Sequence, residues 1–157
     1  MTNNTPKNNE LLNAYISATE ISNRGVIWLD SKGNIIGVNQ NFAQQSGYEK
    51  GDLAGKKVFE INPYLSVMGW RKLWKLLVTE KKHIQEGEHL MANGELMPVK
   101  IRWVLVKISG EEYVCGIVED LFSANRYENL LDIASDISRI VAWEWDVLQN
   151  RLFLPIN

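Results

Sequence analysis

The sequence predicts an α+β domain built on a five-stranded antiparallel sheet with short helices on one face. Three features carry this prediction: a hairpin pattern at residues 26–38, an amphipathic helix pattern at residues 66–82, and three strand-like runs between residues 83 and 121. Hydrophobic positions recur at spacings of three and four in the helical segment, and they alternate with polar positions in the middle strand-like run. We expect one domain with additional segments at both ends.

Composition limits the classes of function open to the chain. Of its 157 residues, 45% are hydrophobic and 23% are charged, which is typical of one globular domain plus some additional length. A formal net charge of -2 and a single cysteine provide neither a basic surface for nucleic acid nor an internal disulfide. No segment approaches the roughly 18 apolar residues of a membrane helix. We therefore expect no nucleic-acid partner, no membrane association and a cytoplasmic location.

Two segments precede the predicted sheet. Residues 1–10 are polar and rich in asparagine, which predicts a disordered tail. Residues 11–24 are predicted to form an amphipathic helix, because their apolar positions are three and four apart. These positions are Leu11, Leu12, Tyr15, Ile16 and Ala18.

The first hairpin and the helix after it have recognisable start and stop residues. Two short β-branched runs at 26–29 and 35–38 flank a turn with Gly33 and Asn34, a pattern typical of a hairpin. Asn39 is placed to cap the next helix, Phe42 is predicted to face inward, and Gly47 is suited to a left-handed helix end. A short helix over 39–47 follows from these residues.

A longer helix and three strands complete the pattern. Residues 66–82 carry an apolar stripe, while Arg71, Lys72 and Lys75 occupy other faces of the helix. That basic face could bind an anion or a partner, although such faces are usually solvated. Strands are predicted at 83–91, 97–108 and 113–121, separated by turns at Asn93-Gly94 and Ser109-Gly110.

The strand at 97–108 has two different faces. Val99, Ile101, Trp103 and Leu105 share one face, and Lys100, Arg102, Val104, Val106 and Ile108 share the other. The second face becomes apolar halfway along, so something must cover it. Either the helix at 11–24 or a second copy of the chain fits this role, and we therefore expect a homodimer through the N-terminal helix and the outer sheet face.

The order of elements and several short motifs resemble the PAS domain, a small α+β sensor and interaction module. Residues 26–56 are similar to its opening pattern of hairpin, short helix and Leu-Gly turn, through Asp30, Gly33, Ile35, Val38, Asn39, Phe42, Gly47, Tyr48, Leu53 and Gly55. Asp120 and Leu121 fit the motif that joins the last PAS strand to an output linker. Phe122 departs from it, because a hydroxyl residue usually stands there. The resemblance places the PAS domain at residues 25–122.

An internal similarity suggests a second module. ATEIS at residues 18–22 recurs as ASDIS at residues 134–138, and the same offset relates Asp30 to Asp146. Residues 141–157 are therefore interpreted as the truncated first hairpin of a second PAS module. The alternative is a chance similarity of two helices that each lead into a strand.

Residues 123–140 are predicted to form a linker helix. Tyr127, Leu130, Leu131, Ala134 and Ile137 form its apolar stripe. Such a helix could carry a signal out of the domain through its packing in a dimer. An ordinary connecting helix lying on its own domain is the alternative.

Six aromatic residues are candidates for a ligand pocket: Trp28, Phe42, Phe59, Trp70, Trp74 and Trp103. They come from the sheet and from the helices that the PAS resemblance places over it, where members of that family hold small ligands. Such a ligand would be apolar or planar. Side chains of this size can also fill the interior of a small domain by themselves, so a filled core is the alternative.

Cofactor chemistry and catalysis have little support. Haem-binding PAS domains use a histidine on or near the long helix, and residues 66–80 contain no histidine. Flavin photosensors of the family use a cysteine on a helix, whereas Cys115 is predicted to be a buried strand residue. Haem and flavin are thus disfavoured. His83 and His89 would lie roughly 20 Å apart in one strand and are interpreted as surface or edge histidines, so we expect no metal site. No catalytic motif is present.

The sequence thus favours a non-catalytic domain that senses or relays a signal by conformational change and dimer contacts. By resemblance it would belong to a multidomain bacterial signalling protein: a sensor histidine kinase, a transcription regulator or a cyclic-dinucleotide enzyme, whose downstream domains would hold any catalytic activity. A ligand-free dimerisation module is the alternative function.

Overall fold

The computed structural model describes residues 5–123 of the chain, with side chains from Asn9 onward. Its strands are β1 (Gly25–Leu29), β2 (Ile35–Val38), β3 (Lys82–Leu90), β4 (Leu96–Ile108) and β5 (Glu111–Asp120). Its helices are α1 (Thr5–Ala18), η1 (Thr19–Ile21), α2 (Gln40–Ser46), α3 (Lys50–Leu53), α4 (Val58–Ile61) and α5 (Val67–Glu80). The predicted linker residues 124–140 and the predicted hairpin at 141–157 lie outside the described residues.

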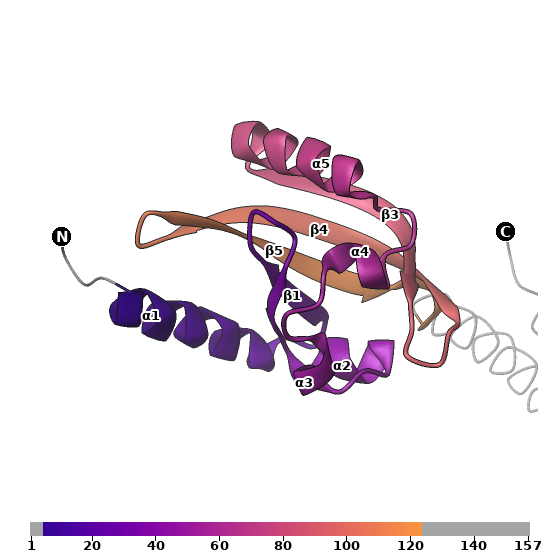
Figure 1. The fold of residues 1–157 in the computed structure, drawn as a ribbon. Helices are drawn as coiled ribbons and strands as arrows, with labels where there is room; N and C mark the ends of the chain where they lie inside the picture. Colours follow the sequence, from indigo (N-terminus) through magenta and orange to yellow (C-terminus); the bar gives the residue numbers. More distant parts are fainter. Residues whose placement is uncertain (1–4, 124–157) are drawn as a thin grey trace, which may run out of the picture. The chain divides into compact units, whose positions relative to one another are not determined.

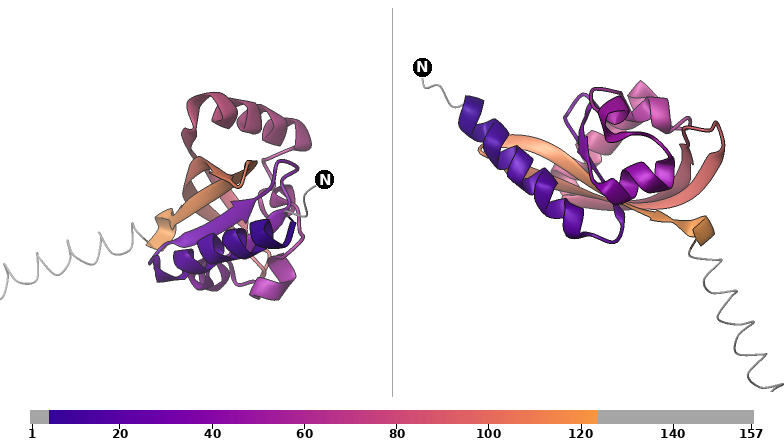
Figure 2. Two further views of the ribbon diagram at one scale, coloured as in Figure 1. Left: turned by 90° about the vertical axis from the view of Figure 1, so that its left-hand side faces the viewer. Right: turned by 90° about the horizontal axis from the view of Figure 1, so that it is seen from below.

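The sheet confirms the predicted fold class. Its five strands pair antiparallel in the order β2-β1-β5-β4-β3. The first hairpin and the last three strands are thus joined through the β1–β5 pair, with β2 and β3 at the two edges. Helix α5 lies on one face of the sheet, which we call the inner face, and α1 lies on the opposite, outer face (Figures 1 and 2).

The N-terminal prediction needs one correction. Helix α1 begins at Thr5, so residues 5–10 are helical and not the disordered tail that their polarity predicts. Pro6 is compatible with this start, because the first turn of a helix has no internal partners for its N–H groups and proline lacks one. The polar residues of this segment belong to a helix that packs mainly through Leu12 and Ile16 farther along.

The helix ends predicted for α2 are confirmed. The Asn39 side chain accepts a hydrogen bond from the Phe42 backbone N–H at 2.9 Å, and Gly47 ends the helix in the left-handed region at φ 76°. Helix α5 begins after Ser66, whose hydroxyl accepts from the Gly69 N–H at 3.0 Å. These caps fix where the two helices start above the inner face.

The strand faces predicted for residues 97–108 are also confirmed. Val99, Ile101 and Trp103 are buried in the inner core, and Leu105 packs against it. Ile108 and Val106 belong instead to a smaller outer cluster with Leu12, Val26, Trp28 and Cys115. Helix α1 therefore covers the outer face around Val106 and Ile108, which is one of the two predicted arrangements, but it leaves Val104 exposed.

Candidate functional site

The inner face holds a core that is filled by aromatic side chains. Trp70 from α5 and Trp103 from β4 are both buried, and their ring centroids lie 6.2 Å apart in an edge-to-face arrangement. Trp103 pairs with Gly116 of β5 in the sheet register. A Cβ at position 116 would lie 2.5 Å from the Trp103 ring, so the absence of a side chain there makes room for the indole.

Two further predicted pocket residues border this group. Trp74 is half-buried, and its ring centroid is 6.0 Å from that of Trp70. Phe59 packs against the same core from α4. The Trp70 Nε1–H donates to the Ser31 carbonyl at 3.0 Å, which ties α5 to the turn between β1 and β2. These contacts favour the filled-core alternative for this end of the inner face.

Trp28 does not belong to the candidate pocket. Strand alternation directs Ile27 and Leu29 into the inner core, whereas Val26 and Trp28 lie in the outer cluster. The Trp28 ring lies 6.3 Å from that of Tyr15 on α1. Its assignment to the pocket was wrong because aromatic character alone does not say which face of a strand a residue occupies.

His89 is buried, which corrects its interpretation as a surface histidine, whereas its strand, β3, is an edge strand as the other interpretation expected. The residue is 1% exposed, and its ring lies edge-on to that of Phe42, with ring centroids 6.0 Å apart. Neither ring nitrogen has a hydrogen-bond partner among the described residues. Burial away from water lowers the His89 pKa from 6.5 to about 4, so the ring is neutral at pH 7.

The aromatic residues of the inner core gather toward two ends of one continuous cluster. His89 pairs with Met97 in the β3–β4 register, whereas Trp103 lies six residues farther along β4, about 20 Å away at 3.3 Å per residue. Phe42 belongs to the His89 region, and Trp70, Trp74 and Trp103 belong to the other. Of the six predicted pocket residues, Trp28 lies outside the inner core and the other five belong to it, and the predicted set missed His89.

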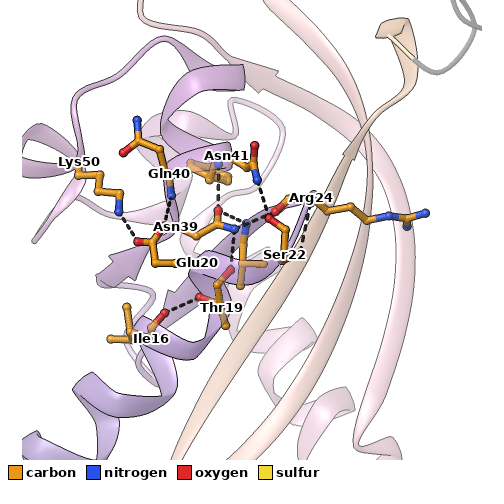
Figure 3. A network of polar contacts seen from close by, with 11 residues as sticks. Ile16, Thr19, Glu20, Ser22, Arg24, Asn39, Gln40, Asn41 and Lys50 are labelled. Atoms are coloured by element: carbon orange, nitrogen blue, oxygen red, sulfur yellow. Dashed lines mark hydrogen bonds and ion pairs between the residues drawn. The ribbon is translucent and has the colours of Figure 1, made fainter.

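Asn39 connects the start of α2 to the segment between α1 and β1 (Figure 3). Its Oδ1 accepts from the N–H groups of Val26 and Phe42 at 2.8 and 2.9 Å. Its Nδ2 donates to the carbonyls of Thr19 and Arg24 at 3.0 and 2.8 Å. Asn39 is fully buried, so these four bonds satisfy a side chain that water cannot reach. Sequence analysis identified the cap but not the other three bonds.

Glu20 and Asn41 add further links across the same junction. The Glu20 carboxylate forms an ion pair with Lys50 and accepts from the Gln40 N–H at 2.8 Å. These two bonds, the Lys50 one first, lower the Glu20 pKa. Asn41 Nδ2 donates to the Ser22 carbonyl. Residues 19–24 are therefore fastened to α2 by several side chains.

The outer face is only partly covered. Cys115 is buried there, as predicted, and the loss of solvation raises its pKa to about 12. Ile84 and Val104 lie outside the cover of α1 and are 53% and 36% exposed. In the β3–β4 register, Ile84 pairs with Arg102 and Val104 pairs with Lys82.

Other predicted sites can be placed only in part. Asp120 ends β5 opposite Val99, and Leu121 follows it, whereas Tyr127, Leu130, Leu131, Ala134 and Ile137 lie outside the described residues. Within residues 5–123, no cluster of three or more His, Cys, Asp or Glu side chains could hold a metal ion. The helices of the same part of the chain are too short or too polar to cross a membrane.

Comparison with known proteins gives the family. Residues 19–125 match the model of the PAS fold, so the chain belongs to the PAS family. No curated protein matches it.

Solved structures support the fold. A PAS domain of an HTR-like protein from Haloarcula marismortui has a TM-score of 0.62 at 21% identity, over 71% of this chain and 98% of that one. A PAS domain from a two-component sensor histidine kinase has a TM-score of 0.60 at 10% identity, over 71% and 97%. A domain of a sensory box sensor histidine kinase/response regulator from Geobacter sulfurreducens has a TM-score of 0.56 at 19% identity, over 70% and 94%.

Proposed function

We propose that this PAS domain senses or relays a signal within a multidomain signalling protein. The output domain would be a histidine kinase, a transcription regulator or a cyclic-dinucleotide enzyme, and the domain itself would be non-catalytic and cytoplasmic. Two of the similar structures come from sensor histidine kinases, which supports the first output. The observation that carries the proposal is the buried Asn39, because its hydrogen bonds join the start of α2 to β1 and to the segment between α1 and β1.

The contacts suggest a route for the signal. His89 touches Phe42, Phe42 lies in the first turn of α2, and Asn39 caps that turn. Asn39 in turn holds the carbonyls of Thr19 and Arg24. A change near His89 would therefore displace the start of α2 and, with it, the junction between α1 and β1. The outer face and α1 would then pass the change to a second copy of the chain.

The Asn39 link is tested by amide hydrogen exchange. Asn39→Ala leaves the N–H groups of Val26 and Phe42 without their acceptor, at a cost of about 1–3 kcal/mol each. We expect faster exchange at both residues. Asn41→Ala, which removes a single bond to Ser22, is the matched control and should leave Val26 protected. Faster exchange in α2 alone would contradict a link across the junction.

A ligand-free dimerisation module is the second candidate function. The aromatic filling of the inner core around Trp103 and the exposed Ile84 and Val104 on the outer face support it. Native mass spectrometry separates the two candidates, since it reports both oligomeric state and bound mass. A dimer that carries an additional small molecule supports sensing by ligand, and a dimer without one under several expression conditions supports the dimerisation module. A protein that is only monomeric would contradict both candidate functions, because both rely on dimer contacts.

A further inference from the structure

A groove lies on the solvent side of α5, and Trp74 stands between it and the inner core. Its volume is about 400 Å³, and it is lined by Ser31, Met68, Arg71, Lys72, Trp74 and Lys75. Residues 68, 71, 72 and 75 follow one face of the helix, because they are three and four positions apart. Ser31 closes one side from the turn between β1 and β2.

The groove combines an apolar surface with unpaired positive charge. Met68 is 58% exposed, and Trp74 is held in place against Trp70. Arg71, Lys72 and Lys75 form no ion pair with any described residue; the cations that do are Arg24, Lys50, Lys56 and Lys100. Three cations so close together on a helix repel one another, in a chain whose formal net charge is -2.

Neighbouring acidic groups do not neutralise these cations. Helix α5 has Glu80 as its only acidic residue, at the far end from Met68. Asp30 precedes Ser31 in the turn, but its carboxylate is held by the N–H groups of Lys32 and Asn34 and by the Asn34 side chain, and it forms no ion pair with the described cations of the groove. The positive charge of the groove is therefore available to a ligand.

We propose that this groove binds a small aromatic anion, of which an aromatic carboxylate is the simplest form. Trp74 and Met68 would cover the planar body of the ligand, since both side chains make favourable contacts with aromatic rings. Arg71 would hold the carboxylate, because its planar guanidinium pairs with two oxygens at once, and Lys72 and Lys75 would add to the attraction.

The dimensions favour a small molecule over a protein partner. The four helical positions span about 10 Å at 1.5 Å per residue. A stable protein interface buries roughly 800 Å² on each partner, which this short stretch of helix does not provide. The volume is within the range of small-molecule sites, roughly 300–1,000 Å³.

Nuclear magnetic resonance titration of isotope-labelled protein with naphthoate tests the proposal. We expect saturable shifts at Ser31, at residues 68–75 and at the Trp74 indole N–H. Naphthylmethanol, which has the same ring without the charge, should bind at least tenfold more weakly. The exposed double variant Arg71→Gln/Lys75→Gln should lose at least tenfold in affinity, about 1.4 kcal/mol.

A second double variant controls for net charge. Lys82→Gln/Lys107→Gln removes two exposed cations outside the groove and should change the affinity by less than twofold. An equal loss in both double variants would overturn the proposal, because it would show non-specific attraction. Equal binding of naphthylmethanol, shifts centred on His89 or Trp103, or the absence of saturable shifts would overturn it as well.

Discussion

The two faces of the sheet are stabilised in different ways. The inner face is covered by several helices, and its core takes residues from β1, β2, β4 and β5 and from α2–α5. The outer cluster has five buried residues, and a single helix, α1, covers it. The helices of the domain therefore cover the inner face, whereas Ile84 and Val104 on the outer face stay exposed. The difference suggests that the inner face sets stability and the outer face is available for assembly.

Replacing a tryptophan on each face should give the largest and most informative contrast. Trp103→Ala removes a fully buried ring between sheet and helices, and we expect a loss near the upper end of the usual 3–5 kcal/mol. Trp28→Ala should cost about 3 kcal/mol, since α1 can move into the space. Urea unfolding followed by circular dichroism measures both. If Trp103→Ala does not fold, Trp103→Phe provides the comparison, and equal losses on both faces would contradict the contrast.

Acid should destabilise the inner face through His89. Its folded pKa of about 4 lies below the unfolded value of 6.5, so between these pH values the unfolded state binds the additional proton. Stability should fall as pH falls below 6.5, by about 1.4 kcal/mol per pH unit and about 3 kcal/mol by pH 4.

Unfolding measured from pH 7 to pH 4 tests this expectation. His89→Leu should remove most of the acid sensitivity, while His83→Gln, on the same strand, should keep it. An unchanged pH dependence in His89→Leu would show that His89 is not the group responsible.

Two glycines on the inner side of the sheet distinguish tight from open packing. Gly116→Ala would place a Cβ 2.5 Å from Trp103 and 2.9 Å from Ile27, and we expect a loss of about 1–3 kcal/mol. Gly87→Ala is the matched control, because no atom lies within 4 Å of its added Cβ, and it should change stability by less than about 0.5 kcal/mol. If the two substitutions lower the thermal unfolding temperature equally, the close packing of Gly116 against Trp103 is ruled out.

The smallest effect on stability is expected at the open part of the outer face. Ile84→Glu should change the unfolding free energy of the monomer by less than about 0.5 kcal/mol, since Ile84 is 53% exposed. It should nevertheless dissociate the proposed dimer in analytical ultracentrifugation. Lys107→Glu, at an exposed position of β4, serves as the control. A dimer that survives Ile84→Glu would place the interface elsewhere.

The sequence predicts patterns more readily than registers. Alternation correctly assigns Val99, Ile101 and Trp103 to one face, and Asn39 and Gly47 correctly mark the ends of α2. Trp28 and His89 were misplaced because alternation within a strand does not reveal which face turns inward. That choice depends on pairing, such as His89 opposite Met97, and pairing joins residues that are distant along the chain.

The candidate site was less predictable than the fold for the same reason. The cap on Phe42 is local and visible in the sequence, three residues after Asn39. The bonds from Asn39 to Thr19 and Arg24 cross 20 and 15 residues, and no local pattern indicates them. The helical start at Thr5 was missed because the polar composition of residues 1–10 gives no sign that the same helix packs through Leu12 and Ile16.

The central claim is that Asn39 couples the inner face to the junction between α1 and β1. A double-mutant comparison by nuclear magnetic resonance tests it most directly. His89→Leu should shift the amide signals of residues 20–26 when Asn39 is present, and the same change should leave them in place in the Asn39→Ala background. Signals that do not move in the native background, or that move equally in both, would contradict the account.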